Sequence, residues 1–273
     1  MLAGAGVPDP VVDAELLLAW TIGPDVSRGE VHAGIIRGDA LSADEHERFR
    51  GLVSRRALRE PLQHITGSAP FRHMTLAIGP GVFVPRPETE IVAQYAIDAL
   101  ANAAEPDPIA VDLGTGSGAI ALAMATEVPH AQVFAVELSP DAHDWASRNT
   151  ADAENLTLVL GDLTDTLTEL DGTIAVVISN PPYVPDDAIP RDPEVRLHDP
   201  VMALYGGADG LDIIRKLSTR ALRLLRPGGM LVIEHGELQG EEIRALLAAD
   251  GWRAATTHPD LTRRDRATTA LRP

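Results

Sequence analysis

The chain has 273 residues, 45% of them hydrophobic and none of them cysteine, so disulfides, thiolate nucleophiles and cysteine-ligated metal sites are excluded. A formal net charge of −17 argues against direct nucleic-acid binding, because a grip on the phosphate backbone needs a concentrated basic face. No apolar run is long enough to cross a bilayer and no secretory signal pattern opens the sequence, so we expect a cytoplasmic protein without membrane association.

Residues 1–70 carry a helical pattern. Asp9-Pro10 offers an N-cap and a proline at the first helical position, and Gly23-Pro24 ends the helix that follows. Ser42–Glu45 forms a capping box for a later helix, which Pro61 ends. That later helix and its end are rich in arginine. The residues are Arg48, Arg50, Arg55, Arg56 and Arg59. We interpret them as a solvated face, and a docking surface for an acidic partner such as an RNA-bound complex is the alternative.

Residues 71–84 predict a short β-hairpin with its turn at Gly79-Pro80-Gly81. Pro85-Arg86-Pro87 then leads into an amphipathic helix whose first turn contains Glu88, Thr89 and Glu90. Acidic residues are favourable at a helix N-terminus, so this segment alone is explained as a linker that enters a helix.

From Ile109 onward, strand and helix patterns alternate, which predicts a doubly wound, mostly parallel sheet with right-handed crossovers. The segments are Ile109–Leu113, Ala119–Thr126, Gln132–Glu137, Pro140–Thr150, Leu156–Leu160, Ile174–Ser179, Leu211–Leu225, Met230–Glu234 and Glu241–Ala249. The remaining residues, Arg253–Pro259 and Arg266–Leu271, predict a final antiparallel hairpin.

A glycine-rich turn leaves the first strand of this sheet. It consists of Asp112, Gly114, Thr115, Gly116, Ser117 and Gly118, with Leu113 between the acid and the first glycine. Glycines here let the backbone approach a ligand closely. The G-x-G-x-G spacing behind an aspartate is more typical of a site for a cationic, phosphate-free cofactor than of a pyrophosphate site.

Acids end the next two strands. Glu137 is placed to accept both hydroxyls of a ribose, and Asp162 could accept from an adenine amino group. Either one alone would be explained as a cap or a solvated loop carboxylate. Together with the glycine turn they predict a nucleoside site where these strand ends meet.

Asn180-Pro181-Pro182-Tyr183 follows the buried strand that ends at Ser179. The prolines fix the backbone and remove two donors, which makes the segment a stiff bend. Its amide and carbonyl oxygens can accept hydrogen bonds from a planar NH2 group, and the aromatic ring can stack on that plane. The simpler explanation, a turn that ends a strand, fits the tetrapeptide when it is taken alone.

This set of motifs resembles the class I S-adenosylmethionine-dependent methyltransferases that act on a planar nitrogen. Arg86–Glu90 and Glu60–Gly67, with the helical N-terminal region, further resemble the release factor glutamine methyltransferases (HemK/PrmC family). The similarity covers essentially the whole chain, including Pro227-Gly228-Gly229 and Glu234-His235-Gly236. It differs in three places: Glu137 replaces a common aspartate, Leu163 an aromatic residue, and Thr262-Arg263 a small Ala-Gly pair.

The resemblance implies a Rossmann-like α/β fold with a seven-stranded, mostly parallel sheet. It also implies three parts: a helical substrate-docking domain over residues 1–70, a β-hairpin linker over 71–86 and a methyltransferase domain over 87–273. The implied reaction moves a methyl group from S-adenosylmethionine to the side-chain nitrogen of the glutamine in the Gly-Gly-Gln motif of class 1 peptide chain release factors.

The resemblance assigns the predicted site residues to three groups. Those for catalysis are Asn180, Pro181, Pro182 and Tyr183. Those for the cofactor are Asp112, Gly114, Thr115, Gly116, Ser117, Gly118, Glu137, Asp162, Leu163 and Asn180. Those for the substrate pocket are Arg86, Glu88, Thr89 and Glu90, and no metal is expected.

Four alternatives remain. An adenine methyltransferase would share Asn180–Tyr183 but needs a basic duplex-binding surface, against which the net charge of −17 argues. A ribosomal-protein glutamine methyltransferase is a close relative with a similar domain plan, but the Arg86–Glu90 segment favours a release factor as the substrate. An NAD-dependent oxidoreductase is disfavoured by the G-x-G-x-G spacing. A non-catalytic binding module is disfavoured by the intact Asn180–Tyr183 segment.

Overall fold

The computed structural model describes residues 1–23 and 25–273, and its chain divides into two compact units. One unit comprises Met1–Ser68 and Pro190–His198, and the other comprises Ala69–Ile189 and Asp199–Pro273. The predicted division into a docking domain (1–70), a linker (71–86) and a methyltransferase domain (87–273) stays a prediction. None of the helices in the described part of the chain is long and apolar enough to cross a membrane.

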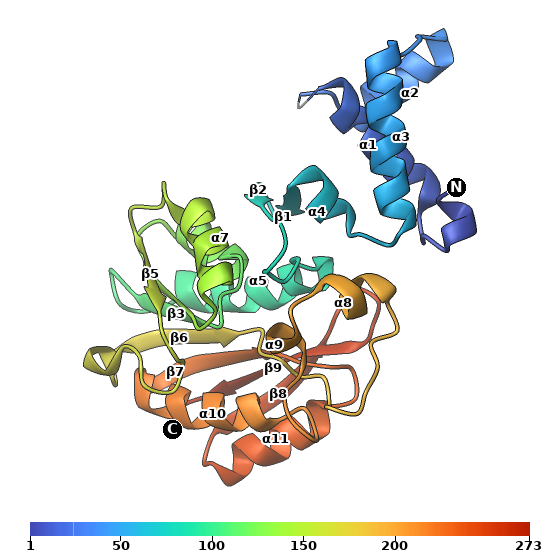
Figure 1. The fold of residues 1–273 in the computed structure, drawn as a ribbon. Coiled ribbons are helices and arrows are strands. Elements are labelled where there is room, and N and C mark those ends of the chain that lie inside the picture. The colour runs from blue at the N-terminus through green and yellow to red at the C-terminus, as the bar shows by residue number, and fades with distance from the viewer. Residues whose placement is uncertain (24) are drawn as a thin grey trace. The chain divides into compact units, whose positions relative to one another are not determined.

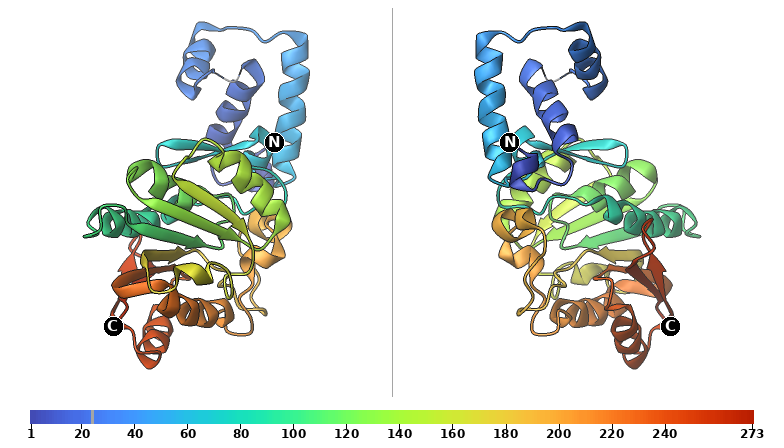
Figure 2. Two further views of the ribbon diagram at one scale, coloured as in Figure 1. Left: turned by 90° about the vertical axis from the view of Figure 1, so that its left-hand side faces the viewer. Right: turned by 90° about the vertical axis from the view of Figure 1, so that its right-hand side faces the viewer.

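The first unit is helical. Its elements are η1 (Ala3–Ala5), α1 (Pro10–Ile22), α2 (Arg28–Arg37), α3 (Ala43–Ala57), α4 (Leu62–Thr66) and α8 (Pro193–His198). Helices α1 and α3 lie side by side (Figures 1 and 2). The capping box that opens α3 is confirmed, since the Ser42 hydroxyl and the Glu45 carboxylate each accept from the other's backbone N–H. Helix α1 ends at Ile22, and Pro24 of the predicted stop lies outside the described residues.

The arginines of α3 and its end are not all solvated. Arg56 is buried and donates to Asp13 (2.7 Å) and to Glu194 of α8 (2.6 Å). Arg59 also pairs with Glu194. For these two arginines the predicted solvated face is wrong, because the acids that they bind belong to the same unit.

The second unit is a doubly wound sheet, as predicted. Its strands are β1 (Ser68–Phe71), β2 (Met74–Ala77), β3 (Ile109–Leu113), β4 (Gln132–Glu137), β5 (Leu156–Leu160), β6 (Ile174–Ser179), β7 (Leu225–Glu234), β8 (Arg253–Pro259) and β9 (Asp265–Leu271). Its helices are α5 (Pro87–Ala101), α6 (Ala119–Glu127), α7 (Pro140–Thr150), η2 (Thr168–Leu170), α9 (Val201–Leu204), α10 (Asp212–Leu224) and α11 (Gly240–Ala249).

Seven strands form the main sheet in the order β5-β4-β3-β6-β7-β9-β8. The pairs from β5 to β7 are parallel, and β9 is antiparallel to both β7 and β8. The predicted C-terminal hairpin is therefore confirmed, and it forms one edge of the sheet (Figure 2). The strand order runs outward from β3 to β4 and β5 on one side, and from β6 to β7 on the other, so the switch point lies between β3 and β6. In open α/β sheets, ligands bind at such a switch point.

Helices cover both faces of this sheet (Figure 1). Helices α5, α6 and α7 pack over one apolar cluster, which includes Val92, Met124 and Ile178. Helices α10 and α11 pack over another, which includes Leu217 and Ile243. Because β6 is buried along its whole length, its residues form the continuous apolar run seen in the sequence.

The small hairpin β1–β2 differs from its prediction. Its turn is Arg72-His73, with Arg72 in the left-handed region (φ 51°), and not Gly79-Pro80-Gly81. The glycine at position 79 serves another purpose, because a Cβ there would overlap the Trp145 ring of α7. The indole Nε1 of Trp145 also donates to the Pro80 carbonyl (3.1 Å).

Candidate functional site

The turn between β3 and α6 forms an open cradle. Gly114, Gly116 and Gly118 all adopt positive φ, at 77°, 58° and 83°. A Cβ added at Gly114 or Gly116 would meet no atom within 4 Å, whereas one at Gly118 would press on Thr150 of α7. The first two glycines therefore leave room beside the backbone for a ligand, and the third allows close helix packing.

Asp112 lies beneath this cradle and is fully buried. Thr115 Oγ1 donates to its Oδ2 (2.6 Å), while Oδ1 has no hydrogen-bond partner among the described residues. Burial raises the pKa of Asp112 to about 7, although the hydrogen bond from Thr115 opposes that effect. A buried acid with an unused oxygen is suited to compensate a positive charge on a ligand.

Glu137, the last residue of β4, is also buried. The backbone N–H of Gly116 donates to its Oε2 (2.7 Å) and that of Ser139 donates to its Oε1 (2.8 Å). Burial raises the pKa of Glu137, and these backbone bonds act against it. Each oxygen retains a lone pair, so the carboxylate can still accept from a pair of hydroxyls.

Asp162 and Leu163 follow β5. Asp162 is exposed, and its Oδ1 accepts from both the backbone N–H and the hydroxyl of Thr164, at 2.8 Å each. These bonds hold the pKa of Asp162 below its usual range. Leu163 is half-buried and packs against the apolar cluster under α10 and α11. Strand β5 is next to β4, so both residues lie on the same side of the switch point as Glu137.

Asn180 comes directly after β6, the strand on the other side of β3. In this parallel pair Asp112 lies beside Ile178, so Gly114 and Asn180, each two residues further on, leave the sheet at the same edge. The structure therefore brings together Asn180–Tyr183, the segment predicted to bind the methyl acceptor, and the glycine-rich turn predicted to bind the cofactor.

The backbone of the Asn180–Tyr183 segment is fixed by a glycine loop. A Cβ at Gly206 would overlap the Pro182 carbonyl, and one at Gly210 would overlap the Tyr183 carbonyl. The Gln239 side chain donates to the Tyr183 carbonyl as well (3.0 Å). Close packing on this side holds the segment, in addition to the stiffness of the two prolines.

The Tyr183 ring packs against the apolar cluster under α10 and α11. Burial raises the pKa of Tyr183 to about 12, and the nearby charge of Glu234 acts in the same direction. The cation of Arg266 opposes both. The phenol therefore stays neutral at physiological pH and is not a base.

Glu234 is the site residue that the sequence prediction did not select. It ends β7 and is 1% exposed, and its Oε2 has no hydrogen-bond partner among the described residues. The polar side chains of Thr89 and Asn180 act on its carboxyl and favour the ionised form. Burial raises the pKa of Glu234 to about 7. Its position at a strand end, next to Asn180 in the sheet order, is the signal by which it could have been found.

Of the four residues predicted for the substrate pocket, Glu88 and Thr89 lie near Asn180 and Glu234, whereas Arg86 and Glu90 have other partners. Thr89 is buried beside Asn180, and the charge of Glu88 acts on both Glu234 and Tyr183. Arg86 instead donates to Asp199 (2.6 Å) and lies over the Phe83 ring. Glu90 faces elsewhere, because its charge acts on Arg72, which also donates to its carbonyl (3.0 Å).

These features fit S-adenosylmethionine. The open cradle at Gly114 and Gly116 lets a ligand approach the protein backbone closely. Asp112 and Glu137 offer hydrogen-bond acceptors at the same edge of the sheet, and all of these residues lie at the switch point. Among the described residues, no group of three or more histidine, aspartate or glutamate side chains could hold a metal ion.

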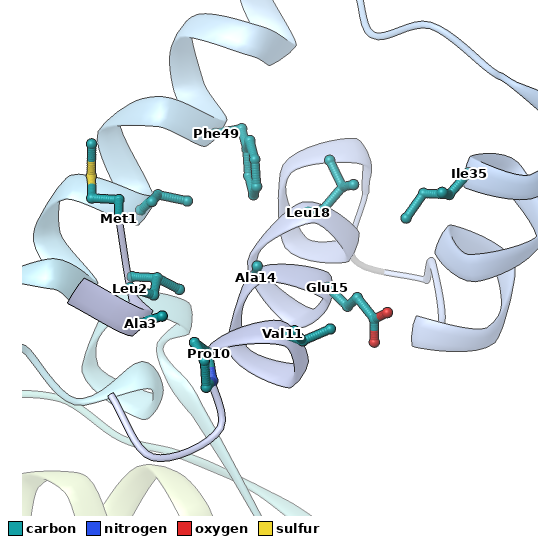
Figure 3. Close-up of a pocket in the computed structure, with 11 residues that line it drawn as sticks. Met1, Leu2, Ala3, Pro10, Val11, Ala14, Glu15, Leu18, Ile35 and Phe49 are labelled. Atoms are coloured by element: carbon teal, nitrogen blue, oxygen red, sulfur yellow. The ribbon is translucent and has the colours of Figure 1, made fainter. Parts of the chain in front are cut away.

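A cavity of about 520 Å³ lies within the helical unit (Figure 3). It is lined almost entirely by apolar side chains of η1, α1, α2 and α3, and Glu15 is its one acid. The lining includes Val11, Leu18, Ile35 and Phe49, and in Figure 3 the side chain of Ile35 points toward Leu18.

Comparison with known proteins gives two family matches. The PrmC N-terminal domain matches residues 1–67, and the methyltransferase small domain matches residues 73–192. The release factor glutamine methyltransferase of Streptomyces coelicolor is 50% identical over 98% of this chain and 93% of its own length. That of Bifidobacterium longum is 47% identical over 97% of this chain and 94% of its own.

A relative with a different printed activity is also similar. The 4-amino-L-phenylalanine/4-methylamino-L-phenylalanine methyltransferase of Streptomyces pristinaespiralis is 38% identical over 99% of this chain and 91% of its own length.

The sheet order, the glycine cradle and the methyltransferase match together define a class I methyltransferase that uses S-adenosylmethionine. Over nearly its full length, the chain belongs to the release factor glutamine methyltransferase family.

Proposed function

We propose that this enzyme methylates the side-chain nitrogen of the glutamine in the Gly-Gly-Gln motif of class 1 peptide chain release factors, in the cytoplasm. The observation that carries the proposal is the common exit of Gly114 and Asn180 at one edge of the sheet. It is supported by relatives of 50% and 47% identity that are named release factor glutamine methyltransferase.

The chemistry follows from the properties of an amide. Its nitrogen is a poor nucleophile because the lone pair is delocalised, so the enzyme's main task is to orient it. We propose that Asn180 Oδ1 and the Pro181 carbonyl accept the two N–H bonds of the glutamine, with Tyr183 beside the amide plane. Positioning of this kind can contribute roughly 7–11 kcal/mol.

The predicted cofactor residues have the complementary task. Bound S-adenosylmethionine supplies an electrophilic methyl group on a sulfonium. We propose that Glu137 accepts from the ribose hydroxyls, that Asp162 and Leu163 border the adenine, and that Asp112 compensates positive charge above the cradle of Gly114, Thr115, Gly116, Ser117 and Gly118. The methylated nitrogen sheds its proton readily once it carries positive charge, so the enzyme needs no strong general base.

The helical unit is proposed to dock the release factor. Its support is the match of residues 1–67 to the PrmC N-terminal domain and the apolar cavity of Figure 3. The acidic net charge of −17 supports a protein substrate over a nucleic acid.

The test is transfer of a labelled methyl group from S-adenosylmethionine to an intact release factor. We expect labelling by the wild-type enzyme, loss of labelling in Asn180→Ala with cofactor affinity retained, and no labelling of a release factor whose motif glutamine is replaced by asparagine. Because one relative acts on 4-amino-L-phenylalanine, that compound is offered in a parallel reaction. Labelling of the amino acid or of DNA, with none of release factor, would contradict the proposal.

A further inference from the structure

The side chain of Asn180 must present its oxygen, not its NH2 group, to a substrate amide. The two ends of an asparagine amide are nearly equal in shape, so only its hydrogen-bond partners can fix which end faces the substrate. The protein therefore needs a group behind Asn180 that accepts hydrogen bonds and donates none.

Glu234 is such a group. Ser179 and Ile233 are partners in the parallel pairing of β6 with β7, so Asn180 and Glu234 are the next residues on adjacent strands. The carboxyl is buried, its Oε2 has no hydrogen-bond partner among the described residues, and the side chains of Asn180 and Thr89 are the polar groups that favour its ionised form. An ionised carboxylate has no hydrogen to donate, so both partners must turn their hydrogens toward it.

Thr89 transmits the same constraint by a second route. Asn180 Nδ2 lies 3.5 Å from Thr89 Oγ1, at the long end of hydrogen-bond distance. A hydroxyl that donates its single hydrogen to Glu234 can only accept from Asn180. Both routes therefore draw the NH2 end of Asn180 away from the substrate and leave Oδ1 directed to the opposite side.

We infer that Glu234 is a positioning residue, which acts with Thr89 to fix the orientation of the Asn180 amide so that its oxygen accepts the substrate N–H. The inference rests on the proposed role of Asn180 but concerns a group that makes no contact with the substrate. A protonated Glu234 could donate to Thr89, whose hydroxyl could then donate to Asn180 Oδ1, and the amide would turn the wrong end to the substrate.

Burial and the groups around Glu234 set the pH at which its carboxyl becomes protonated. Burial and the negative charge of Glu88 on α5 raise its pKa, while the hydrogen bonds from Thr89 and Asn180 and the cation of Arg266 on β9 lower it. Tyr183 is neutral at this pH and does not titrate with it. Since the result is a pKa of about 7, we expect kcat to rise with pH through neutrality.

The test is kcat against pH for the wild-type enzyme and for Glu234→Gln, Thr89→Val and Thr89→Ser. Glutamine both donates and accepts, so Glu234→Gln should lower kcat about tenfold at pH 8 and flatten the profile, with the affinity for S-adenosylmethionine unchanged. Thr89→Val should also lower kcat, and Thr89→Ser, which retains the hydroxyl, should restore it. Glu237→Gln makes the same chemical change at an exposed position and should behave as wild type.

A measurement without substrate separates this inference from the proposed function. The carboxyl of Glu234, followed by 13C NMR in the free protein, should titrate at higher pH in Thr89→Val, because the variant lacks a hydrogen bond that favours the ionised form. Failure of the wild-type enzyme to label release factor would contradict the proposed function alone. An unchanged titration in Thr89→Val, or a wild-type pH profile in Glu234→Gln, would overturn the role of Glu234.

Discussion

Three buried carboxyl groups at the strand ends of this enzyme share one electrostatic property. Burial raises the pKa of Asp112, Glu137 and Glu234, in contrast to the exposed Asp162, whose pKa is lowered by hydrogen bonds. Buried carboxyls with perturbed pKa values concentrate at functional sites, because function requires a charge where solvation is poor. In this protein they surround the region where a cationic cofactor is proposed to bind.

Asp112 gives a prediction for cofactor binding. Its pKa is raised to about 7 in the free protein, and a positive ligand favours the ionised form. The affinity for S-adenosylmethionine should therefore fall several-fold as the pH is lowered from 7.5 to 6, and titration calorimetry measures this. Asp112→Asn should bind more weakly and lose the dependence, and the exposed control Asp152→Asn should keep it. A pH dependence that survives in Asp112→Asn would assign it to another group.

Most of the candidate site could be predicted at the level of single residues. Gly114–Gly118, Glu137 and Asn180 stand at strand ends, and a strand end is visible in the sequence as the point where an apolar run stops. Glu234 stands at such a point too, and Glu234-His235-Gly236 belongs to the family resemblance, but neither the strand end nor the resemblance assigned this carboxyl a chemical role. Its role depends on pairing with β6, which is a property of the sheet order and not of local sequence.

At the scale of elements, the helix α8 shows what sequence separation conceals. Arg56 bonds Glu194, 138 residues away, and Arg59 bonds the same carboxylate. Burial alone would raise the pKa of Glu194, but the hydrogen bonds from these arginines outweigh it and hold the pKa well below its usual range. The arginine-rich pattern of α3 predicts a charged face, but nothing in it indicates that the partner lies on a segment beyond β6.

The cavity among α1, α2 and α3 yields a prediction on docking. Ile35 lines the cavity and Ile36 does not, although both belong to α2 and are exposed, at 57% and 78%. If the release factor occupies the cavity, Ile35→Asp should raise KM for intact release factor severalfold, because it places a charge on an apolar contact. Ile36→Asp should leave KM unchanged.

Cofactor affinity distinguishes this effect from misfolding. Both α2 variants should bind S-adenosylmethionine as the wild type does, and both should show the helical circular dichroism of the wild type. Equal KM values for Ile35→Asp and Ile36→Asp would show that the release factor does not use this cavity.

At the scale of the whole molecule, the two units differ in where the described acids with a pKa raised to about 7 lie, since Asp112 and Glu234 both belong to the catalytic unit. In the helical unit, hydrogen bonds from arginine hold the pKa values of Glu15, Glu60 and Glu194 below their usual range. In the catalytic unit, burial raises the pKa values of Asp112 and Glu234 to about 7. Stability should therefore respond to pH differently in the two units.

The sign follows from proton linkage. Between pH 8 and 6.5 an unfolded chain keeps Asp112 and Glu234 ionised, while the folded catalytic unit takes up protons on both. Its stability should therefore increase as the pH falls through this window, by roughly 1 to 2 kcal/mol for the two groups together. The acids of the helical unit are ionised in both states throughout the window, so they should contribute no change there. Below pH 6.5, His235 and His258 oppose the gain, because burial lowers their pKa values.

Hydrogen exchange with mass spectrometry, corrected for intrinsic rates, resolves the two units. We expect peptides from β3 and β6 to gain protection from pH 8 to pH 6.5, and peptides from α1 and α3 to remain unchanged. The double variant Asp112→Asn/Glu234→Gln removes both titrating groups, so its catalytic unit should show no gain. If the protection of β3 and β6 in the wild type instead declines from pH 8 to pH 6.5, the folded protein must stabilise the ionised forms of Asp112 and Glu234. The raised pKa values would then be wrong, and with them the pH dependence expected for cofactor binding and for turnover.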